Sequence, residues 1–380
     1  MTAAPAGALA RNRHIDFLRG VAILCVLILH FALAYGLKNS PLGSLLGPEL
    51  VHAVAFNGNY GVTIFFVISG YLITSNSLAR WSELPAIDAR AFYRMRVARI
   101  MPCLILALAV IVTLGCFGVP YFTNSDNHQH LGAGYFVISV ASVLGFWHNV
   151  LMQSSGYVNY CIDIYWSLSV EEVFYLLLPL VCLGARRTWL IVAMCLAAIA
   201  LGPLYRYQHA DDEIYFMYGY LACFDAIAIG CLTAMIARRA ALPAGPGRIL
   251  RWFALALLAA IYLRGIDGHE VFGFSFIALA SAVYLFAAAS DAGALAAATR
   301  SWQIPAATIR WLGHHSYELY LFHIIVLALM RNLIGKDQLS YAARLPWFAL
   351  FMSLSACVAW LVARHVSEPA NAVIRRLRLA

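Results

Sequence analysis

The sequence predicts an all-α integral membrane protein with about ten transmembrane helices. Of its 380 residues, 63% are hydrophobic and only 12% are charged, whereas a soluble domain carries roughly 25% charged residues. A soluble fold of this length could not shield so much apolar surface from water, so the expected surroundings are a lipid bilayer. This composition argues against an ordinary soluble enzyme, a disordered chain and a nucleic-acid-binding protein, although the net charge is +8.

Apolar runs close to the ~20 residues that cross a bilayer recur along the whole chain. They cover residues 21–37, 54–78, 100–119, 135–151, 164–184, 190–205, 215–237, 252–266, 271–289, 309–330 and 347–366. The first run follows Arg11, Arg13 and Arg19 but precedes no small-x-small cleavage site. We therefore interpret it as a retained first span rather than a removed signal peptide.

Arginine clusters set the expected orientation, because cytoplasmic loops carry an excess of Arg and Lys. If all clusters lie in the cytoplasm, the chain is on the outer side of the membrane after residue 119 and has returned to the cytoplasm by Arg186. Only one span therefore fits between residue 119 and Arg186. Run 135–151 is short and precedes polar residues, so we expect a re-entrant or interfacial segment there. The prediction is ten spans with both termini cytoplasmic, forming a single multi-pass domain over 1–380 in the cytoplasmic (inner) membrane. The clusters lie at 11–19, 90–99, 186–187, 238–251 and 364–378.

Ionisable residues inside apolar runs are the first functional candidates, since they are costly at membrane depth. His30 follows Arg19 by eleven residues, which places both on one helix face, ~20° apart, with His30 ~16 Å further along. Asp16 falls within ~40° of the same face. The alternative is that a neighbouring span's backbone satisfies His30, but no other polar residue lies between 20 and 34. We favour a functional role.

Two adjacent carboxylates, Glu171 and Glu172, lie near the start of another apolar run. On a helix, Tyr165, Ser169 and Glu172 share one stripe, and neighbouring residues point ~100° apart. At least one of the two carboxylates is therefore expected to face the bundle. It serves a site, or it pairs with an arginine that locks the spans together.

Four arginines crowd the expected loop 90–99, namely Arg90, Arg94, Arg96 and Arg99. Arg suits bidentate contact with phosphate groups. The alternative is an ordinary positively charged cytoplasmic loop. With nine cysteines but no CxxC pair, the sequence predicts no metal site.

Several other polar residues lie in or beside the apolar runs. Ser316, Tyr320 and His323 form a stripe at i, i+4 and i+7, which lines a cavity or makes only interhelical hydrogen bonds. Ser69-Gly70 permits a close helix approach, but it is no GxSxG nucleophile motif. Further along the chain, two carboxylates are each able to neutralise an arginine; these are Asp225 and Glu368.

Taken in order, these segments resemble the acyltransferase-3 family of integral membrane acyltransferases. The stretch 14–22 followed by His30 is similar to its opening DxLRGxA…H pattern, and 166–175 is similar to its WSLxxEExFY motif. The remaining segments resemble the FFxxSGY, RxxRIxP, DxxxxG, SYxxYLxH and ExP patterns; they are 65–73, 93–102, 225–230, 316–323 and 368–369. Val173 and Phe322 depart from the Gln and Trp common in the family.

The resemblance implies an acyl-CoA co-substrate, acetyl-CoA or a short-chain acyl-CoA, taken from the cytoplasmic side. It also implies a sugar-containing acceptor: a glycan, a lipid-linked saccharide or a glycosylated small molecule. His30 is then the catalytic residue, with Arg19 essential beside it. Some relatives carry an added extracytoplasmic hydrolase-like domain that this sequence lacks. We therefore expect either no two-part acetyl relay or a separate partner.

These expectations combine into a direct-transfer hypothesis. His30 accepts the proton of the acceptor hydroxyl as it attacks the thioester, and Glu172 or Glu171 orients the imidazole or the sugar. We expect Arg94, Arg96 and Arg99, with Tyr93, to bind the CoA phosphates. Arg19 is expected to contact the pantetheine end or the carbonyl. The candidate substrate contacts are Asp16, Trp166, Ser69, Tyr320 and His323.

Three alternatives remain open on sequence grounds. A covalent acyl-enzyme through His30 or Ser69 would stay within the same class. Buried Glu and His residues also suit a proton-coupled secondary transporter of a sugar-like solute, although no internal repeat is visible. A flippase-like structural subunit is the third. The sequence does not determine the acyl chain, the acceptor or the oligomeric state.

Overall fold

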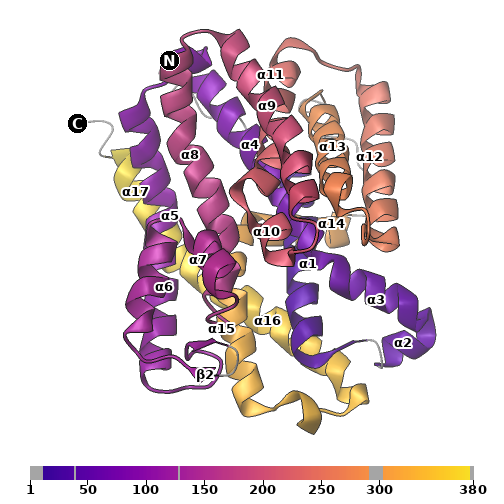
Figure 1. The fold of residues 1–380 in the computed structure, drawn as a ribbon. Helices are drawn as coiled ribbons and strands as arrows, with labels where there is room; N and C mark the ends of the chain where they lie inside the picture. The colour runs from indigo at the N-terminus through magenta and orange to yellow at the C-terminus, as the bar shows by residue number, and fades with distance from the viewer. Residues whose placement is uncertain (1–11, 38–39, 127–128, 291–302, 377–380) are drawn as a thin grey trace. The chain divides into compact units, whose positions relative to one another are not determined.

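The structure, a computed structural model, describes residues 12–37, 40–126, 129–290 and 303–376, which are nearly all helical (Figure 1). The helices are α1 (Arg13–Tyr35), α2 (Pro41–Leu46), α3 (Pro48–Phe56), α4 (Tyr60–Trp81), α5 (Ala89–Cys116), α6 (Tyr135–Leu144), α7 (His148–Ser155), α8 (Trp166–Ala185), α9 (Thr188–Gln208), α10 (Glu213–Tyr218), α11 (Tyr220–Arg239), α12 (Ala244–Arg264), α13 (Glu270–Ser290), α14 (Gln303–His314), α15 (Ser316–Leu333), α16 (Arg344–Val362) and α17 (Glu368–Arg376). A short antiparallel pair and several single turns complete the described elements: β1 (Ser125–Asp126), β2 (Gln129–His130), 3₁₀ turns at Asn57–Asn59, Leu84–Ala86, Asp163–Tyr165, Lys336–Gln338 and Tyr341–Ala343, and a π turn at Ala363–Ser367.

Residue contacts group the chain into two compact units. Unit 1 contains Met1–Ala22, Tyr60–Phe92 and Val173–Gly313. Unit 2 contains Ile23–Asn59, Tyr93–Glu172 and His314–Ala380. Helices α1, α5 and α8 each contribute residues to both units. Each unit therefore draws on distant parts of the sequence.

Nine helical segments of the described chain are long and apolar enough to cross a bilayer, which confirms the predicted all-α membrane fold. Each contains or overlaps one of the predicted runs. The segments are Arg13–Tyr35, Pro48–Trp81, Ala89–Cys116, Asp163–Ala185, Thr188–Gln208, Glu213–Arg239, Ala244–Arg264, Glu270–Ser290 and Tyr341–Ala372.

The predicted span 309–330 is wrong as one continuous helix. The chain turns at His315, so its first residues belong to α14 and the remainder to α15. Helix α15 has 18 residues and rises about 27 Å, which is close to the ~30 Å of a hydrocarbon core. It is absent from the nine apolar segments because it carries Glu318, His323 and Arg331. The described chain thus shows nine candidate spans against the ten predicted, and α15 is close in length to what a tenth would need.

The segment predicted as re-entrant or interfacial, 135–151, consists of two short helices. Helix α6 has 10 residues and α7 has 8, so α6 rises only about 15 Å, half of a bilayer core. Neither helix is long enough to span alone, which agrees with the prediction of a re-entrant or interfacial segment.

The arginine-rich loop predicted over 90–99 is wrong, because these residues form the first three turns of α5. Arg has a good helix propensity, so nothing in this stretch stops the helix. Pro102 lies inside the same helix. The helical spacing turns Arg96 and Arg99 ~60° apart and Arg94 away from both.

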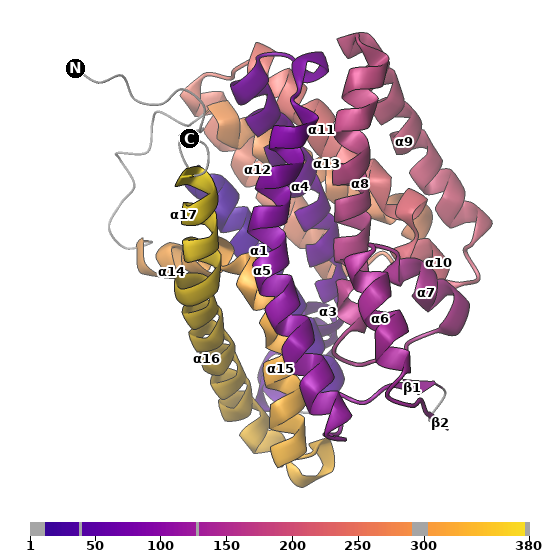
Figure 2. The same cartoon turned by 90° about the vertical axis from the view of Figure 1, so that its left-hand side faces the viewer.

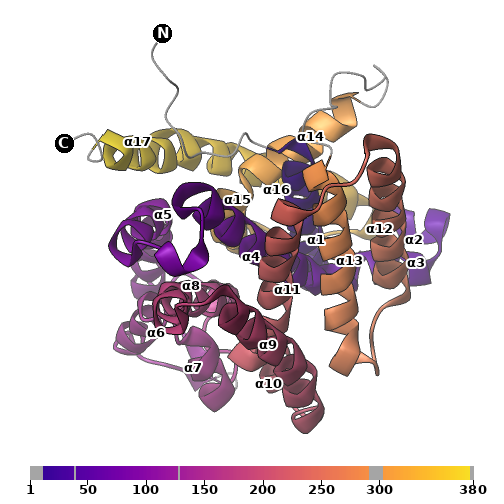
Figure 3. The same cartoon turned by 90° about the horizontal axis from the view of Figure 1, so that it is seen from above.

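Glycines bring two helices of unit 1 into backbone contact. A Cβ on Gly70 of α4 would overlap the carbonyl oxygen of Ile227 in α11, and a Cβ on Gly230 would overlap that of Val67. Only glycine permits such an approach, so this contact confirms the predicted role of Ser69-Gly70. Helices α4 and α11 pack along one another in unit 1 (Figure 3).

A buried ion pair links α11 to two further helices of unit 1. Arg206 of α9 and Asp225 of α11 lie 2.7 Å apart, and each side chain is only 1% exposed. Ser275 of α13 accepts from Arg206 Nη2 at 2.7 Å and donates to Asp225 at 2.6 Å. This pairing confirms that Asp225 neutralises an arginine.

Helix α15 lies at the core of unit 2. Twelve of its residues are buried, and it packs along α16 (Figure 2). Its tyrosines bond to the backbone of other helices: Tyr317 donates to the Ile100 carbonyl at 2.8 Å, and Tyr320 to that of Ile164 at 2.7 Å. Tyr165 donates in return to the Leu321 carbonyl at 3.0 Å. These bonds fix α15 against α5 and the 3₁₀ turn that precedes α8.

Candidate functional site

His30 lies on α1 and is half-buried. Its Nδ1 lies 2.9 Å from the carbonyl oxygen of Val26, one turn earlier in the same helix. The same nitrogen lies 3.2 Å from Nε2 of His323 on α15, and the ring centroids are 4.9 Å apart. Two histidines separated by 293 positions in the sequence therefore meet inside unit 2.

His323 is completely buried. Its Nδ1 lies 2.9 Å from the carbonyl oxygens of both Leu319 and Tyr320, and its Nε2 faces His30. Both ring nitrogens therefore have partners within unit 2. The imidazole is held by backbone groups of its own helix, which fixes its orientation.

Tyr320 connects the histidine helix to the start of α8. Its hydroxyl donates to the Ile164 carbonyl and lies 2.7 Å from Ser167 Oγ. The Ser316, Tyr320 and His323 stripe thus contributes interhelical hydrogen bonds, one of the two alternatives that its spacing left open. Trp166, the neighbour of Ser167, is half-buried.

The two carboxylates of α8 differ in burial, as their spacing predicts. Glu172 is 6% exposed, whereas Glu171 is half-buried. The Glu172 Oε1 atom is buried without a hydrogen-bond partner among the described residues. Arg96 and Arg99 of α5 lie within electrostatic range of this carboxylate. A buried carboxylate oxygen without a partner among the described residues is suited to accept a hydrogen bond from a ligand.

The predicted phosphate-binding residues separate into two groups on α5. Arg96 and Arg99 interact electrostatically with Glu172, and Arg96 is half-buried. Arg94 is exposed, and Tyr93 is half-buried. Two of the three predicted arginines therefore act electrostatically on the predicted carboxylate, although Arg99 is exposed like Arg94.

Three predicted site residues belong to unit 1. Asp16 is 9% exposed on the first part of α1, where a Cβ on Gly313 of α14 would overlap its carbonyl oxygen. Arg19 is half-buried on the same helix. The Ser69 hydroxyl bonds to that of Tyr175 in α8. Ser69 therefore already has a partner within unit 1.

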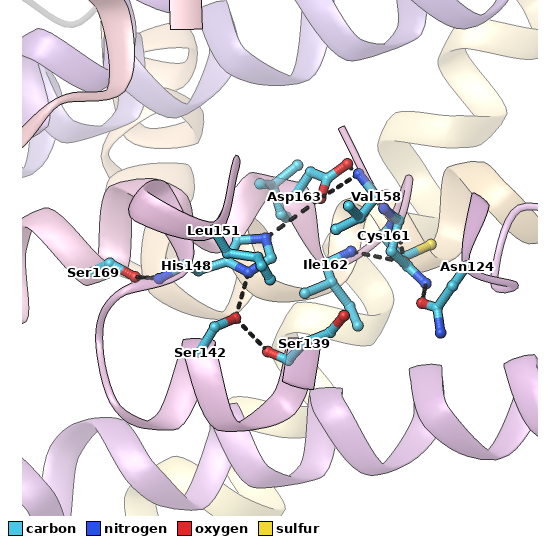
Figure 4. A network of polar contacts seen from close by, with 12 residues as sticks. Asn124, Ser139, Ser142, His148, Leu151, Val158, Cys161, Ile162, Asp163 and Ser169 are labelled. Atoms are coloured by element: carbon cyan, nitrogen blue, oxygen red, sulfur yellow. Dashed lines mark hydrogen bonds and ion pairs between the residues drawn. The ribbon is translucent and has the colours of Figure 1, made fainter. Parts of the chain in front are cut away.

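A second polar cluster escaped the sequence analysis (Figure 4). His148 Nδ1 lies 2.7 Å from Ser142 Oγ, and its Nε2 lies 3.3 Å from Asp163 Oδ1. The side chains of Ser142 and His148 are fully buried, and Ser142 Oγ donates to the Ser139 carbonyl. A nucleophile needs access to a substrate, so this Ser–His–Asp arrangement serves the fold. His148 lies within the apolar run 135–151, and our criterion for ionisable residues would have found it.

The second carboxylate oxygen of Asp163 anchors the chain before α8. It accepts from the backbone N–H of Asn159 at 3.1 Å. The Asn159 side chain in turn donates to Phe122 and Asn124, at 3.0 and 2.9 Å. The cluster thus ties the loop before α8 to the segment after α5, within unit 2.

The fold and these polar residues define a multi-pass helical membrane protein with an imidazole pair and a buried carboxylate inside one unit. The family model described as an acyltransferase domain, that of acyltransferase-3, matches residues 12–364. The chain therefore belongs to the acyltransferase-3 family, which confirms the resemblance drawn from its motifs.

Among known proteins, the chain is similar to the O-acetyltransferase OatA of Staphylococcus aureus, with 24% identity over 343 residues, 82% of this chain and 52% of the relative. It is also similar to the peptidoglycan O-acetyltransferase OatA of Listeria monocytogenes, with 24% identity over 343 residues, 85% of this chain and 50% of the relative. The chain thus spans about half the length of these curated relatives. No solved structure matches it.

Proposed function

We propose that this chain is a membrane-bound O-acyltransferase that moves an acetyl or other short acyl group from cytoplasmic acyl-CoA to a hydroxyl of a sugar-containing acceptor. The observation that carries the proposal is the half-buried imidazole of His30 within an apolar helix of an acyltransferase-3 chain. The names of the relatives support acetyl as the acyl group and a glycan as the acceptor.

Because the thioester is already activated, the chemistry that remains is to remove the proton of the acceptor hydroxyl, which needs a general base. In the proposed reaction, the acceptor oxygen attacks the thioester carbonyl carbon while the His30 imidazole takes the hydroxyl proton. The carbon–sulfur bond then breaks, and the CoA thiolate leaves with the proton that His30 returns. His30 ends neutral, so one residue serves a complete cycle.

The charged part of the donor needs cations outside the apolar core. Acyl-CoA phosphates cannot enter a bilayer, and arginine binds phosphate through paired N–H donors. We assign this role to Arg94, Arg96 and Arg99, with Tyr93 beside them. Arg19 would contact the thioester carbonyl or the pantetheine end.

Glu172 is assigned to the acceptor or the pantetheine chain. Its buried Oε1 has no partner among the described residues, so a ligand hydroxyl or amide N–H would satisfy it. Asp16, Trp166 and Glu171 remain proposed contacts to the substrates.

The test is acyl-CoA consumption by the purified protein in detergent, followed as release of the CoA thiol with a sugar acceptor present. Acceptor-dependent thiol release is the expected result. A proton-coupled transporter would release no thiol under any acceptor, and that outcome would overturn the proposal.

The acceptor class needs a separate experiment. Mass spectrometry of glycans and lipids from cells with and without the gene should show one species that loses an acyl mass increment. Complementation with the unaltered gene should restore that increment. If every sugar-containing species keeps its mass, a sugar acceptor is ruled out.

A further inference from the structure

We infer that His323 is a positioning residue, and that its contact with His30, together with that of the Val26 carbonyl, makes Nε2 of His30 the nitrogen that exchanges the proton. The inference deepens the proposed function and rests on it for its chemistry. The assignment of protons to the ring nitrogens rests only on contacts within unit 2.

The proton on His323 is determined first. Its Nδ1 lies 2.9 Å from two carbonyl oxygens, those of Leu319 and Tyr320. A carbonyl oxygen only accepts, so a lone pair on Nδ1 would face two other lone pairs. Nδ1 therefore carries the hydrogen and shares it between the two oxygens. In the neutral ring, Nε2 then carries a lone pair, and that lone pair faces His30.

The proton on His30 follows from the same rule. Its Nδ1 lies 2.9 Å from the Val26 carbonyl oxygen and 3.2 Å from the lone pair on His323 Nε2. Both neighbours are acceptors, so the His30 Nδ1 carries a hydrogen. Nε2 is then the unprotonated nitrogen of the neutral ring, and it is the atom able to take a proton.

This arrangement suits a base that must cycle. When Nε2 takes a proton, the positive charge spreads over a ring whose Nδ1–H already donates to two acceptors, which stabilises the imidazolium. The ring also keeps its orientation because the Nδ1 contacts do not change. His323 itself is completely buried with both nitrogens engaged, so we assign it to positioning and not to substrate contact.

The direct test is ¹⁵N NMR of histidine-labelled protein, because protonated and unprotonated ring nitrogens resonate far apart. His30→Ala identifies the His30 signals by their loss. The expected spectrum of the neutral protein shows a protonated Nδ1 and an unprotonated Nε2 for His30, and the same for His323. An unprotonated Nδ1 on His30 would overturn the inference, whatever the activity.

Two substitutions of His323 distinguish a positioning role toward His30 from a role in packing alone. Gln can present an oxygen near the place of Nε2 and so keep an acceptor for His30, whereas Asn is too short to reach it. In His323→Asn, the Val26 carbonyl is the one acceptor among the described residues left at the His30 Nδ1. We expect this variant to raise the share of the other His30 tautomer and to lower kcat on the order of 10- to 100-fold, with little change in the KM for acyl-CoA. His323→Gln should keep most of the wild-type His30 tautomer and most of the wild-type kcat.

Controls keep this inference distinct from the proposed function. His52 is exposed on α3 and stacks on Phe56, so His52→Gln should change neither the His30 signals nor the turnover. Should His30→Ala keep full turnover while the spectrum is as expected, the proposed base is wrong but the positioning contact stands. Equal losses for His323→Gln and His323→Asn, with an unchanged tautomer, would reduce His323 to a packing role.

Discussion

The buried pair between Arg206 and Asp225 allows a stability change to be worked out from the structure. The guanidinium donates from Nε to the Val271 carbonyl at 2.9 Å, from Nη1 to the Ala222 carbonyl and Asp225, and from Nη2 to Asp225 and Ser275. Asp225→Ala removes the only anion among these partners. A buried cation left without its anion costs about 3–5 kcal/mol. We therefore expect Asp225→Ala to lower the free energy of unfolding by that amount.

The assay is denaturant unfolding in detergent micelles. It compares the wild type, the single variants Asp225→Ala and Arg206→Leu, and the variant that carries both changes. Replacing both partners, as in Arg206→Leu with Asp225→Ala, should cost less than the sum of the single changes, because no unpaired charge remains. The exposed Asp211 provides the control, and Asp211→Ala should change the free energy by no more than ~0.5 kcal/mol. A single-variant loss below ~1 kcal/mol, or strictly additive losses, would refute the reasoning.

Three further changes have expected outcomes. Gly70→Ala should lower stability by about 1–3 kcal/mol, because its Cβ meets the backbone of Ile227; Gly184→Ala, with nothing near its Cβ, should be neutral or stabilising in the same denaturant-unfolding assay. Arg94→Ala should weaken acyl-CoA binding in titration calorimetry and leave acceptor affinity unchanged; unchanged donor affinity would remove its phosphate role. Arg19→Lys should lose most turnover, since Lys lacks the paired donors of Arg, and full turnover would contradict that role.

The membrane fold was predictable from the sequence because hydropathy and arginine placement are local signals. The short run 135–151 was correctly excluded by counting crossings between arginine clusters. Helix breaks are less visible: the turn at His315 lies within an apolar run and was not predicted, although Gly313 precedes it by two residues. The start of α5 was missed for a related reason: the arginines of 90–99 were taken for a loop because of their charge, although Arg is a good helix former.

The candidate site was predictable only residue by residue. The placement of His30 in an apolar run marked it as unusual, and the stripe of Tyr165, Ser169 and Glu172 is buried as expected. The contact between His30 and His323 joins helices far apart in the sequence, and no periodicity within one helix predicts a partner on another. Arg206 was missed because it lies just beyond a run judged to end at 205.

The most direct test of the central claim is the turnover of acyl-CoA and a sugar acceptor by purified His30→Ala protein. The variant should elute and unfold like the wild type and bind acyl-CoA, yet transfer no acyl group above background. His52→Ala, prepared in parallel, should transfer at the wild-type rate. Near-normal transfer by His30→Ala would contradict the assignment of His30 as the base.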